Sequence, residues 1–363
     1  MAKETKVETK KATAVTIQPV KKTSLAMKAA PKIPQKRSGG AIVSNKEDKV
    51  YKNALNNEKA EVIADFQASL DKNSRVKLKG TLVGASLLEV KKGEPPLVMA
   101  IVVYKGFKVK IPAHQFLLPI RDKNTGKFIS YSRENFTVED IKKTIKRRFA
   151  SEVDFRVTKI TKDGTVLGSR VQAMNELMEY WWLRSVANVT DENGNPLPYI
   201  RAGIAAKPRI VTVVDSGIYI ELLGVESYIG NPELGHIYID SAKDFYHVGD
   251  TIDVIITKVQ KTENSVMFWA SNRLASLAQF REDFDQVMKG DTYMGEVIHV
   301  NFDSTVNETS FFVKIGDRLQ VRCTMGDNIA RLPRKGSFVE MKITGKYEDT
   351  LMIKGIITHV TRP

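Results

Sequence analysis

The sequence of 363 residues contains a single cysteine, Cys323, and only five histidines. One cysteine excludes an intramolecular disulfide and any zinc site that needs several cysteines. The histidines show no pair at the spacing of metal ligands; they are residues 114, 236, 247, 299 and 359. A chain without a disulfide is typical of a reducing compartment, so we expect a cytoplasmic location.

Long hydrophobic runs are also missing from this chain. The longest uninterrupted run, residues 97–104, has eight apolar residues. A membrane-spanning helix needs about 20. We therefore expect no membrane partner.

Motifs that would carry catalysis or hold a cofactor are scarce. There is no glycine-rich phosphate loop of the Walker type and no His/Cys cluster. Asp191, Asn193 and Asn195 have the spacing of a calcium loop, but Gly194 comes too early and Ala202 stands where the loop needs Glu. We expect a turn at this stretch, no metal, no cofactor and a protein that is not an enzyme.

The positive charge is concentrated at one end of the chain. Net charge is +14; the first 50 residues hold twelve Lys/Arg against four Asp/Glu, and the remaining 313 hold 44 against 38. Residues 1–57 lack a periodic apolar stripe, so we predict a disordered basic tail. It is a solubilising tail, an arm that adds phosphate contacts, or a targeting peptide. Residues 58–73 follow as a short helix, with Val62, Phe66 and Leu70 on one stripe.

A strand pattern that occurs twice is the most informative feature present. Residues 217–222 (GIYIEL) and 310–315 (SFFVKI) both read small, apolar, aromatic, β-branched, charged, aliphatic. Because side chains alternate along a strand, Tyr219 and Glu221 are predicted to face outward, opposite Ile220. An exposed ring on a β-surface favours stacking with nucleic-acid bases, and we assign this role to Tyr219 and Phe312. The alternative is that these rings cover a seam of the fold.

Further strand patterns recur at similar intervals and divide the chain into three units. Residues 153–160, 252–259 and 338–343 are alternating strands, each followed by a turn and another strand. Repeated short strands with turn signals favour several small barrels over one large sandwich. The predicted boundaries are a first unit at 74–173 with a helical insertion at 117–150, a helical linker at 174–198, a middle unit at 199–273, a helical linker at 274–289 and a last unit at 290–363.

The order of these elements resembles the S1 RNA-binding domain family. The features that carry the resemblance are a first strand with glycine, the aromatic second strand, the Val248-Gly249-Asp250 turn and a final strand that runs into Ser and Arg. The resemblance implies a mainly β fold of three tandem five-stranded OB-type barrels. It also implies single-stranded RNA as the ligand, mRNA held in or near translation, and the ribosome as a candidate partner.

The family usually places a second aromatic or His on the strand after the aromatic one, and the three units differ there. The middle unit has Tyr228 nearby. The last unit offers Arg318 and Arg322, which with Lys314 are candidate phosphate contacts. The first unit has Ile101 in place of the ring, so we expect it to serve mainly in structure or protein contacts. Its next strand still contributes candidate contacts, namely Phe107, Lys108 and Lys110.

A basic helix is predicted inside the insertion of the first unit. Thr137 is placed to cap it, with acidic residues in the first turn. The cations near its end complement the helix dipole or bind phosphate, and like-charge pairs four residues apart favour a phosphate partner. These candidates are Lys142, Lys143, Lys146 and Arg147.

The three tryptophans are expected to pack rather than to bind. Trp181 and Trp182 are adjacent in the predicted linker helix and cannot both face one core, so we expect one of them to pack across a joint between units. Trp269 lies on the last strand of the middle unit and is assigned to packing.

Taken together, the sequence predicts a single-stranded RNA-binding protein. Two alternatives remain open. The barrels of a scaffold or adaptor would contact ribosomal or RNA-processing proteins. A single-stranded DNA-binding protein would use the same stacking and charge, which do not read the 2′-hydroxyl.

Overall fold

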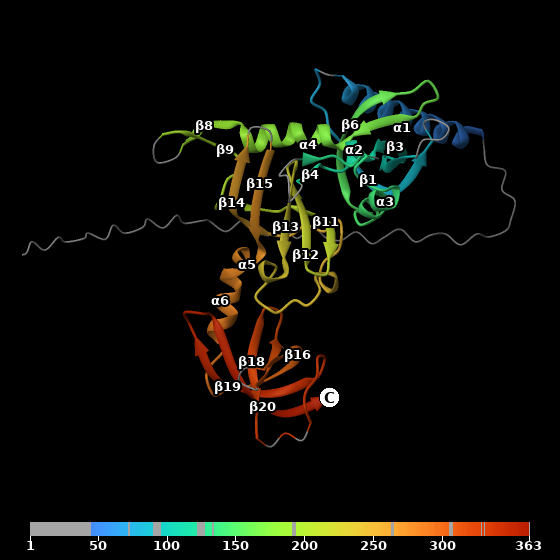
Figure 1. The fold of residues 1–363 in the computed structure, drawn as a ribbon. Helices are drawn as coiled ribbons and strands as arrows, with labels where there is room; N and C mark the ends of the chain where they lie inside the picture. Colours follow the sequence, from blue (N-terminus) through green and yellow to red (C-terminus); the bar gives the residue numbers. More distant parts are fainter. Residues whose placement is uncertain are drawn as a thin grey trace, which may run out of the picture. The chain divides into compact units, whose positions relative to one another are not determined.

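The computed structural model has a mainly β fold, as the sequence predicts (Figure 1). Residues 55–363 form one unit, to which all contacts reported below belong. The residues that the structure describes are 45–71, 73–89, 96–121, 128–132, 134–190, 194–262, 265–304, 308–327, 329 and 331–362.

The first unit contains a closed five-stranded barrel. Its strand order, β1-β2-β3-β7-β6, is that of the OB fold, with β3 and β7 parallel. Gly80 is needed in β1, because a Cβ there would lie 2.7 Å from the carbonyl oxygen of Val103. The strands are β1 (Leu78–Leu88), β2 (Leu97–Tyr104), β3 (Phe107–Pro112), β6 (Glu152–Ile160) and β7 (Val166–Ser169).

Helix α1 (Asn45–Leu70) packs against this barrel through its C-terminal half. Val62 and Phe66 are buried in the barrel core, and Asp65 accepts a hydrogen bond from the Tyr104 hydroxyl at 2.7 Å. The helix begins earlier than the predicted start at residue 58, so residues 45–57, which we assigned to a disordered tail, are helical instead. The rest of the predicted tail, 1–44, lies outside the described residues.

The insertion between β3 and β6 holds four short elements. They are α2 (Ala113–Phe116), β4 (Ile120–Arg121), β5 (Phe128–Ile129) and α3 (Val138–Lys146). The predicted cap is confirmed, because the Thr137 side chain accepts a hydrogen bond from the backbone N–H of Asp140. Ile141 and Ile145 point into the barrel core, which turns Lys143 and Lys146 toward solvent.

The predicted linker 174–198 is only half helical. Helix α4 (Arg170–Met178) runs into a π-helical turn, η1 (Glu179–Leu183), and the chain then forms a hairpin of β8 (Ser185–Thr190) and β9 (Pro196–Pro198). Trp182 is fully buried in the core of the middle unit, and its indole N–H donates to the carbonyl oxygens of Leu222 and Leu223. The expectation that the adjacent tryptophans cannot share one core is wrong, because Trp181 also packs, partly buried, against the core that contains Trp182.

The middle unit does not form the predicted third closed barrel within the described residues. Its strands make two three-stranded sheets, β10-β14-β15 and β11-β12-β13, around one shared core. Pro208 separates β10 from β11 and has no N–H for a ladder, so two short strands replace one long first strand. The strands are β10 (Ala205–Ala206), β11 (Arg209–Val214), β12 (Gly217–Leu222), β13 (Val225–Gly230), β14 (Val254–Thr262) and β15 (Ser265–Ser271).

The other edge of the middle unit is joined by a side chain. Ser227 on β13 donates its hydroxyl to the carbonyl oxygen of Phe268 on β15 at 2.5 Å. In an OB barrel a parallel backbone ladder joins these two strands, as it joins β3 to β7 in the first unit. The single bond leaves the outer surface between β13 and β15 open. Two 3₁₀ turns, η2 (Asn231–Glu233) and η3 (Ala242–Asp244), follow β13.

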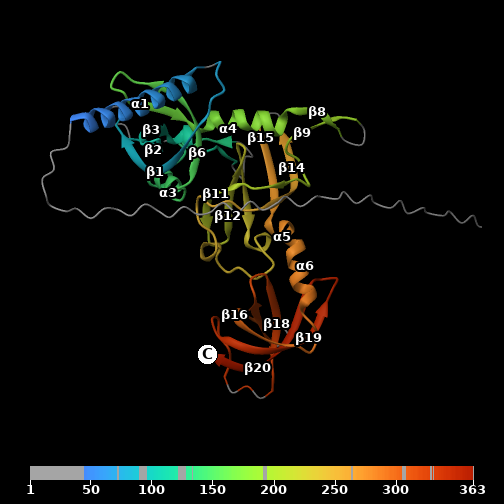
Figure 2. The same ribbon diagram turned by 180° about the vertical axis from the view of Figure 1, so that it is seen from behind.

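Helices α5 (Asn272–Ala275) and α6 (Leu277–Gln286) lead into the last unit, a second closed barrel (Figure 2). Its order, β16-β17-β18-β20-β19, repeats that of the first barrel, and a Cβ on Gly295 would lie 2.3 Å from the carbonyl oxygen of Lys314. Cys323 is buried in its core, and burial raises the pKa of its thiol to about 12. The strands are β16 (Thr292–Asp303), β17 (Glu308–Ile315), β18 (Leu319–Met325), β19 (Phe338–Tyr347) and β20 (Met352–Arg362). No helix among the described residues is long and apolar enough to cross a bilayer.

A buried ionic cluster ties the first unit to the middle unit. Arg170, at the start of α4, is 2% exposed and reaches both Glu221 and Glu226 at 2.5 Å. Arg209 bonds Glu221 and also Asp154 of β6, while Arg148 forms a two-bond pair with Glu226. These side chains are withdrawn from water, where an unpaired charge would be very costly.

Removing the central cation of this cluster should strongly destabilise the protein. We expect Arg170→Met to lower the free energy of unfolding by about 3–5 kcal/mol, because buried carboxylates lose a partner. Urea denaturation followed by circular dichroism measures the loss. Lys79→Met is the control, since Lys79 pairs with Glu152 on the surface at 3.8 Å and should contribute less than about 1 kcal/mol. Equal effects of the two substitutions would contradict the assignment.

The cluster should also make stability sensitive to acid. Burial alone would raise the pKa of Glu226, but the charges and hydrogen bonds of Arg148 and Arg170 outweigh it and lower that pKa to about 2. A carboxyl pKa lowered by folding stabilises the protein above its unfolded pKa of about 4.3, and the stabilisation disappears as pH falls toward 2. The stability deficit of Glu226→Gln at pH 7 should therefore shrink steadily between pH 5 and 2.5. Urea denaturation at each pH measures this deficit. A deficit that stays constant over this range would contradict the lowered pKa of Glu226.

Candidate nucleic-acid interface

Two tyrosines form an exposed pair on the middle unit. Tyr219 on β12 and Tyr228 on β13 are direct cross-strand partners. Their ring centroids are 5.0 Å apart, and the side chains are 39% and 40% exposed. The Tyr228 hydroxyl donates to the backbone oxygen of Ser216 at 2.7 Å, which fixes that ring in place. The pair therefore offers a pre-arranged aromatic surface, and bases stack on such surfaces.

Glu221 was predicted to be exposed beside Tyr219, and this is wrong. Glu221 does lie on the same face of β12, two residues from Tyr219, but it is only 3% exposed. The ionic cluster covers this end of the strand with Arg170 from α4. The outward face of β12 and β13 is thus divided into a buried ionic end and an open aromatic end.

Trp269 was assigned to packing, but the structure exposes it. The side chain is 41% exposed on the outer face of β15, and the ammonium group of Lys258 lies 5.0 Å from the centre of its ring. Strand alternation contains the signal that we missed, since Phe268 is the buried neighbour and the next residue must face outward.

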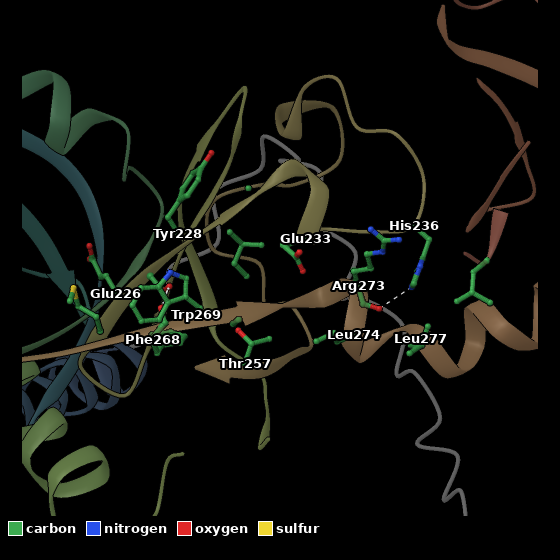
Figure 3. Close-up of a pocket in the computed structure, with 16 residues that line it drawn as sticks. Glu226, Tyr228, Glu233, His236, Thr257, Phe268, Trp269, Arg273, Leu274 and Leu277 are labelled. Carbon is green, nitrogen blue, oxygen red and sulfur yellow. Dashed lines mark hydrogen bonds between the residues drawn. The ribbon is translucent and has the colours of Figure 1, made fainter. Parts of the chain in front are cut away.

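A groove runs along the open edge between β13 and β15 (Figure 3). Its volume is about 980 Å³. Tyr228 and Trp269 contribute to its wall at one end, and His236, whose ring nitrogen is 2.9 Å from the carbonyl oxygen of Arg273, lies at the other. Burial lowers the pKa of His236. The groove and the tyrosine pair share Tyr228 and therefore form one continuous surface.

In the last unit the predicted ring, Phe312, belongs to an aromatic stack. It lies opposite His299 on β16 and opposite Arg322 on β18. The ring of Tyr238, from the loop after β13 of the middle unit, stacks on His299 at 3.9 Å and lies 6.2 Å from Phe312. Tyr238 also donates its backbone N–H to Gln320 at 2.7 Å. Phe312 is half-buried as a result.

The candidate cations of the last unit differ in their surroundings. Arg322 is exposed beside Phe312 and contacts the Ser310 hydroxyl at 3.1 Å, so its charge is available. Lys314 is half-buried, with Asp317 at 4.0 Å. Arg318 pairs with Asp283 of α6 at 3.1 Å, which makes it part of the joint to that helix.

The first unit presents charge without a free ring. Phe107 lies against Phe66 of α1 with ring centroids 6.3 Å apart, so helix packing occupies it. Lys108 is exposed on the same strand, and Lys110 is half-buried.

The basic helix α3 lies beside the middle unit. Lys143, Lys146 and Arg147 are exposed and Lys142 is half-buried; none of the four has an ion-pair partner among the described residues. Arg148, directly after them, pairs with Glu226, two residues before Tyr228 on β13. The Arg148–Glu226 pair thus joins the segment directly after α3 to the strand that carries Tyr228.

No group of three or more His, Cys, Asp or Glu side chains is arranged to hold a metal in the part of the chain that the structure describes. The predicted turn at 191–196 falls partly on residues 191–193, which lie outside that part.

Comparison with known proteins identifies the middle unit. Residues 200–269 match the family model of the S1 RNA binding domain. This range contains both tyrosines and Trp269, so the aromatic surface lies on an S1 RNA binding domain.

The chain is also similar to a curated ribosomal protein. It is 25% identical over 111 residues to small ribosomal subunit protein bS1 of Staphylococcus haemolyticus. The match covers 30% of this chain and 28% of that protein.

Two solved structures are more distant. A multidomain protein with nucleic acid binding domains from Streptococcus pneumoniae is 11% identical with a TM-score of 0.17, over 80% of this chain and 75% of that one. Drosophila Unr CSD456 is 9% identical with a TM-score of 0.16, over 79% and 97%. Such scores do not indicate a shared overall arrangement.

The stack of Tyr238 on His299 is open to a direct spectroscopic check. Protons above an aromatic ring are shielded, so Tyr238→Ala should move the His299 ring resonances downfield in a ¹H–¹³C NMR spectrum. His114, His247 and His359, which lie farther along the chain from Tyr238, serve as internal controls and should not move. Unchanged His299 resonances would mean that Phe312 and His299 are uncovered in solution.

Proposed function

We propose that this chain binds single-stranded RNA on the outer face of β12 and β13, with Tyr219 and Tyr228 stacking against successive bases. The single observation that carries the proposal is the exposed tyrosine pair within an S1 RNA binding domain. Each stacked base contributes about 1–3 kcal/mol, and stacking tolerates any base sequence.

The unpaired cations of α3 are proposed to contact phosphates of the same strand. They stand beside β13 through the Arg148–Glu226 pair, whose two hydrogen bonds are 2.5 and 2.9 Å long. Phosphate contacts release counterions, so they supply affinity that falls with salt and carries no base preference. In this arrangement the two tyrosines stack on the bases, and the cations of α3 contact the sugar–phosphate backbone of the RNA.

We further propose a role in translation, in which the protein holds mRNA, on the ribosome or close to it, in the cytoplasm. The similarity to a small ribosomal subunit protein supports this role. The function proposed is binding without catalysis, in keeping with a match to a binding domain.

Removing both rings should test the binding proposal. Tyr219→Ala with Tyr228→Ala should weaken binding of a fluorescein-labelled 12-nucleotide RNA by about 25-fold or more, from a loss of at least about 1 kcal/mol per ring. Fluorescence anisotropy measures it, repeated across salt. Phe338→Ala is the matched control, because Phe338 is 41% exposed, close to the exposure of the two tyrosines, but lies on β19 of the last barrel. Unchanged affinity in the double variant would refute the stacking role.

The same titration separates RNA from other nucleic acids. Single-stranded RNA should bind more tightly than duplex, and the logarithm of the affinity should fall with log salt by about 0.7 for each phosphate contact. Replacing Lys143, Lys146 and Arg147 together with Gln should reduce that slope by about 2. Equal affinity for single-stranded RNA and single-stranded DNA would indicate a protein that binds single strands of either kind.

An adaptor is the second candidate function. The observation in its favour is that two of the predicted ring positions contact protein, Phe107 through Phe66 and Phe312 through Tyr238. Such faces suit contacts with ribosomal or RNA-processing proteins. Pull-down after nuclease treatment separates the two functions, because partners bridged by RNA are lost and direct protein partners remain.

A further inference from the structure

Trp269 is exposed to solvent, although packing in a core would bury most of a tryptophan side chain. It stands 41% exposed on β15, whereas Trp182, in the same unit, is fully buried. A single exposed ring is ordinary, but Trp269 lines the same groove as Tyr228, and a contiguous exposed aromatic surface of this kind indicates a binding site.

The surroundings of Trp269 narrow the chemistry of that ligand. Lys258 is its cross-strand partner and lies over its ring. Lys258 has no carboxylate partner among the residues that the structure describes, so its positive charge remains available to an anion. An aromatic ring beside an unpaired cation suits a nucleotide, whose base stacks on the ring and whose phosphate is attracted to the cation.

The groove between β13 and β15 gives such a ligand room. Its volume of about 980 Å³ lies at the upper end of ordinary ligand sites. It exists because one side-chain bond from Ser227 to Phe268 replaces the backbone ladder that would close a barrel. The wall also includes Met267, a flexible side chain that adapts to different ligands.

We propose that this groove receives a further nucleotide of the bound RNA, with its base stacked on Trp269 and its phosphate near Lys258. The strand would then cross from Tyr219 over Tyr228 into the groove and end on β15. This inference rests on the proposed RNA-binding function and extends it by a third stacking position. The open edge that prevents barrel closure thereby becomes part of the binding surface.

Tryptophan fluorescence tests this inference separately from affinity. In a Trp181→Phe background the only tryptophans are Trp182, which is buried, and Trp269, which is exposed. Adding oligouridylate, which does not emit, should quench the emission because a base stacks on the Trp269 indole. Trp269→Phe in the same background should abolish the quenching while keeping most of the affinity, since phenylalanine also stacks.

Affinity measurements complete the test. Trp269→Ala should weaken RNA binding by about 5- to 140-fold, corresponding to one stacked base. Lys258→Met should reduce the salt slope by about 0.7. Far-UV circular dichroism checks that each variant is folded.

The possible outcomes distinguish the two claims. If RNA binds by anisotropy but quenching is absent and Trp269→Ala binds normally, the groove is not occupied by RNA and only the tyrosine pair is used. If RNA does not bind the parent protein at all, the RNA-binding function and this inference both fail.

Discussion

The placement of Arg170 between the buried Glu221 and the partly buried Glu226 determines how the functional surface is built. Glu221 and Glu226 are cross-strand partners, so their like charges would repel inside a dry interface. Arg170 contacts both, and Arg148 and Arg209 complete the neutralisation. The three arginines belong to different elements: Arg170 to α4, Arg148 to the turn directly after α3 and Arg209 to β11. These elements must therefore meet at the cluster. The cluster therefore joins two units that share no continuous core.

This joint explains why binding residues from different units lie together. One end of the outer face of β12 and β13 is closed by arginines, and the other end remains open with Tyr219 and Tyr228. Arg148 also fixes the chain directly after α3 to β13 through Glu226. A buried salt bridge is a weak source of stability compared with apolar packing, but it defines one arrangement and makes others costly.

The sequence predicted the local parts of this surface and missed the long-range parts. Strand alternation placed Tyr219 outward because that rule depends only on neighbours along the chain. The same rule placed Glu221 outward, and it failed because Arg170, 51 residues earlier, covers it. Two missed features could have been predicted from the sequence, because both follow from local chemistry. They are the effect of Pro208 on barrel closure and the outward direction of the Trp269 side chain. The stack on His299 was not readable, because Tyr238 belongs to another unit.

Whether the aromatic rings of each unit are covered or exposed depends on which other elements pack against that unit. Phe107 is covered by α1, whose apolar stripe needs a partner, and Phe312 is half-buried next to the Tyr238 loop. In the middle unit the preceding linker packs Trp182 into the core, and no element that the structure describes covers Tyr228 and Trp269. An aromatic surface that the chain leaves uncovered retains its affinity for an external ring. Incomplete closure of the middle unit and exposure of its rings are thus two consequences of the same local packing.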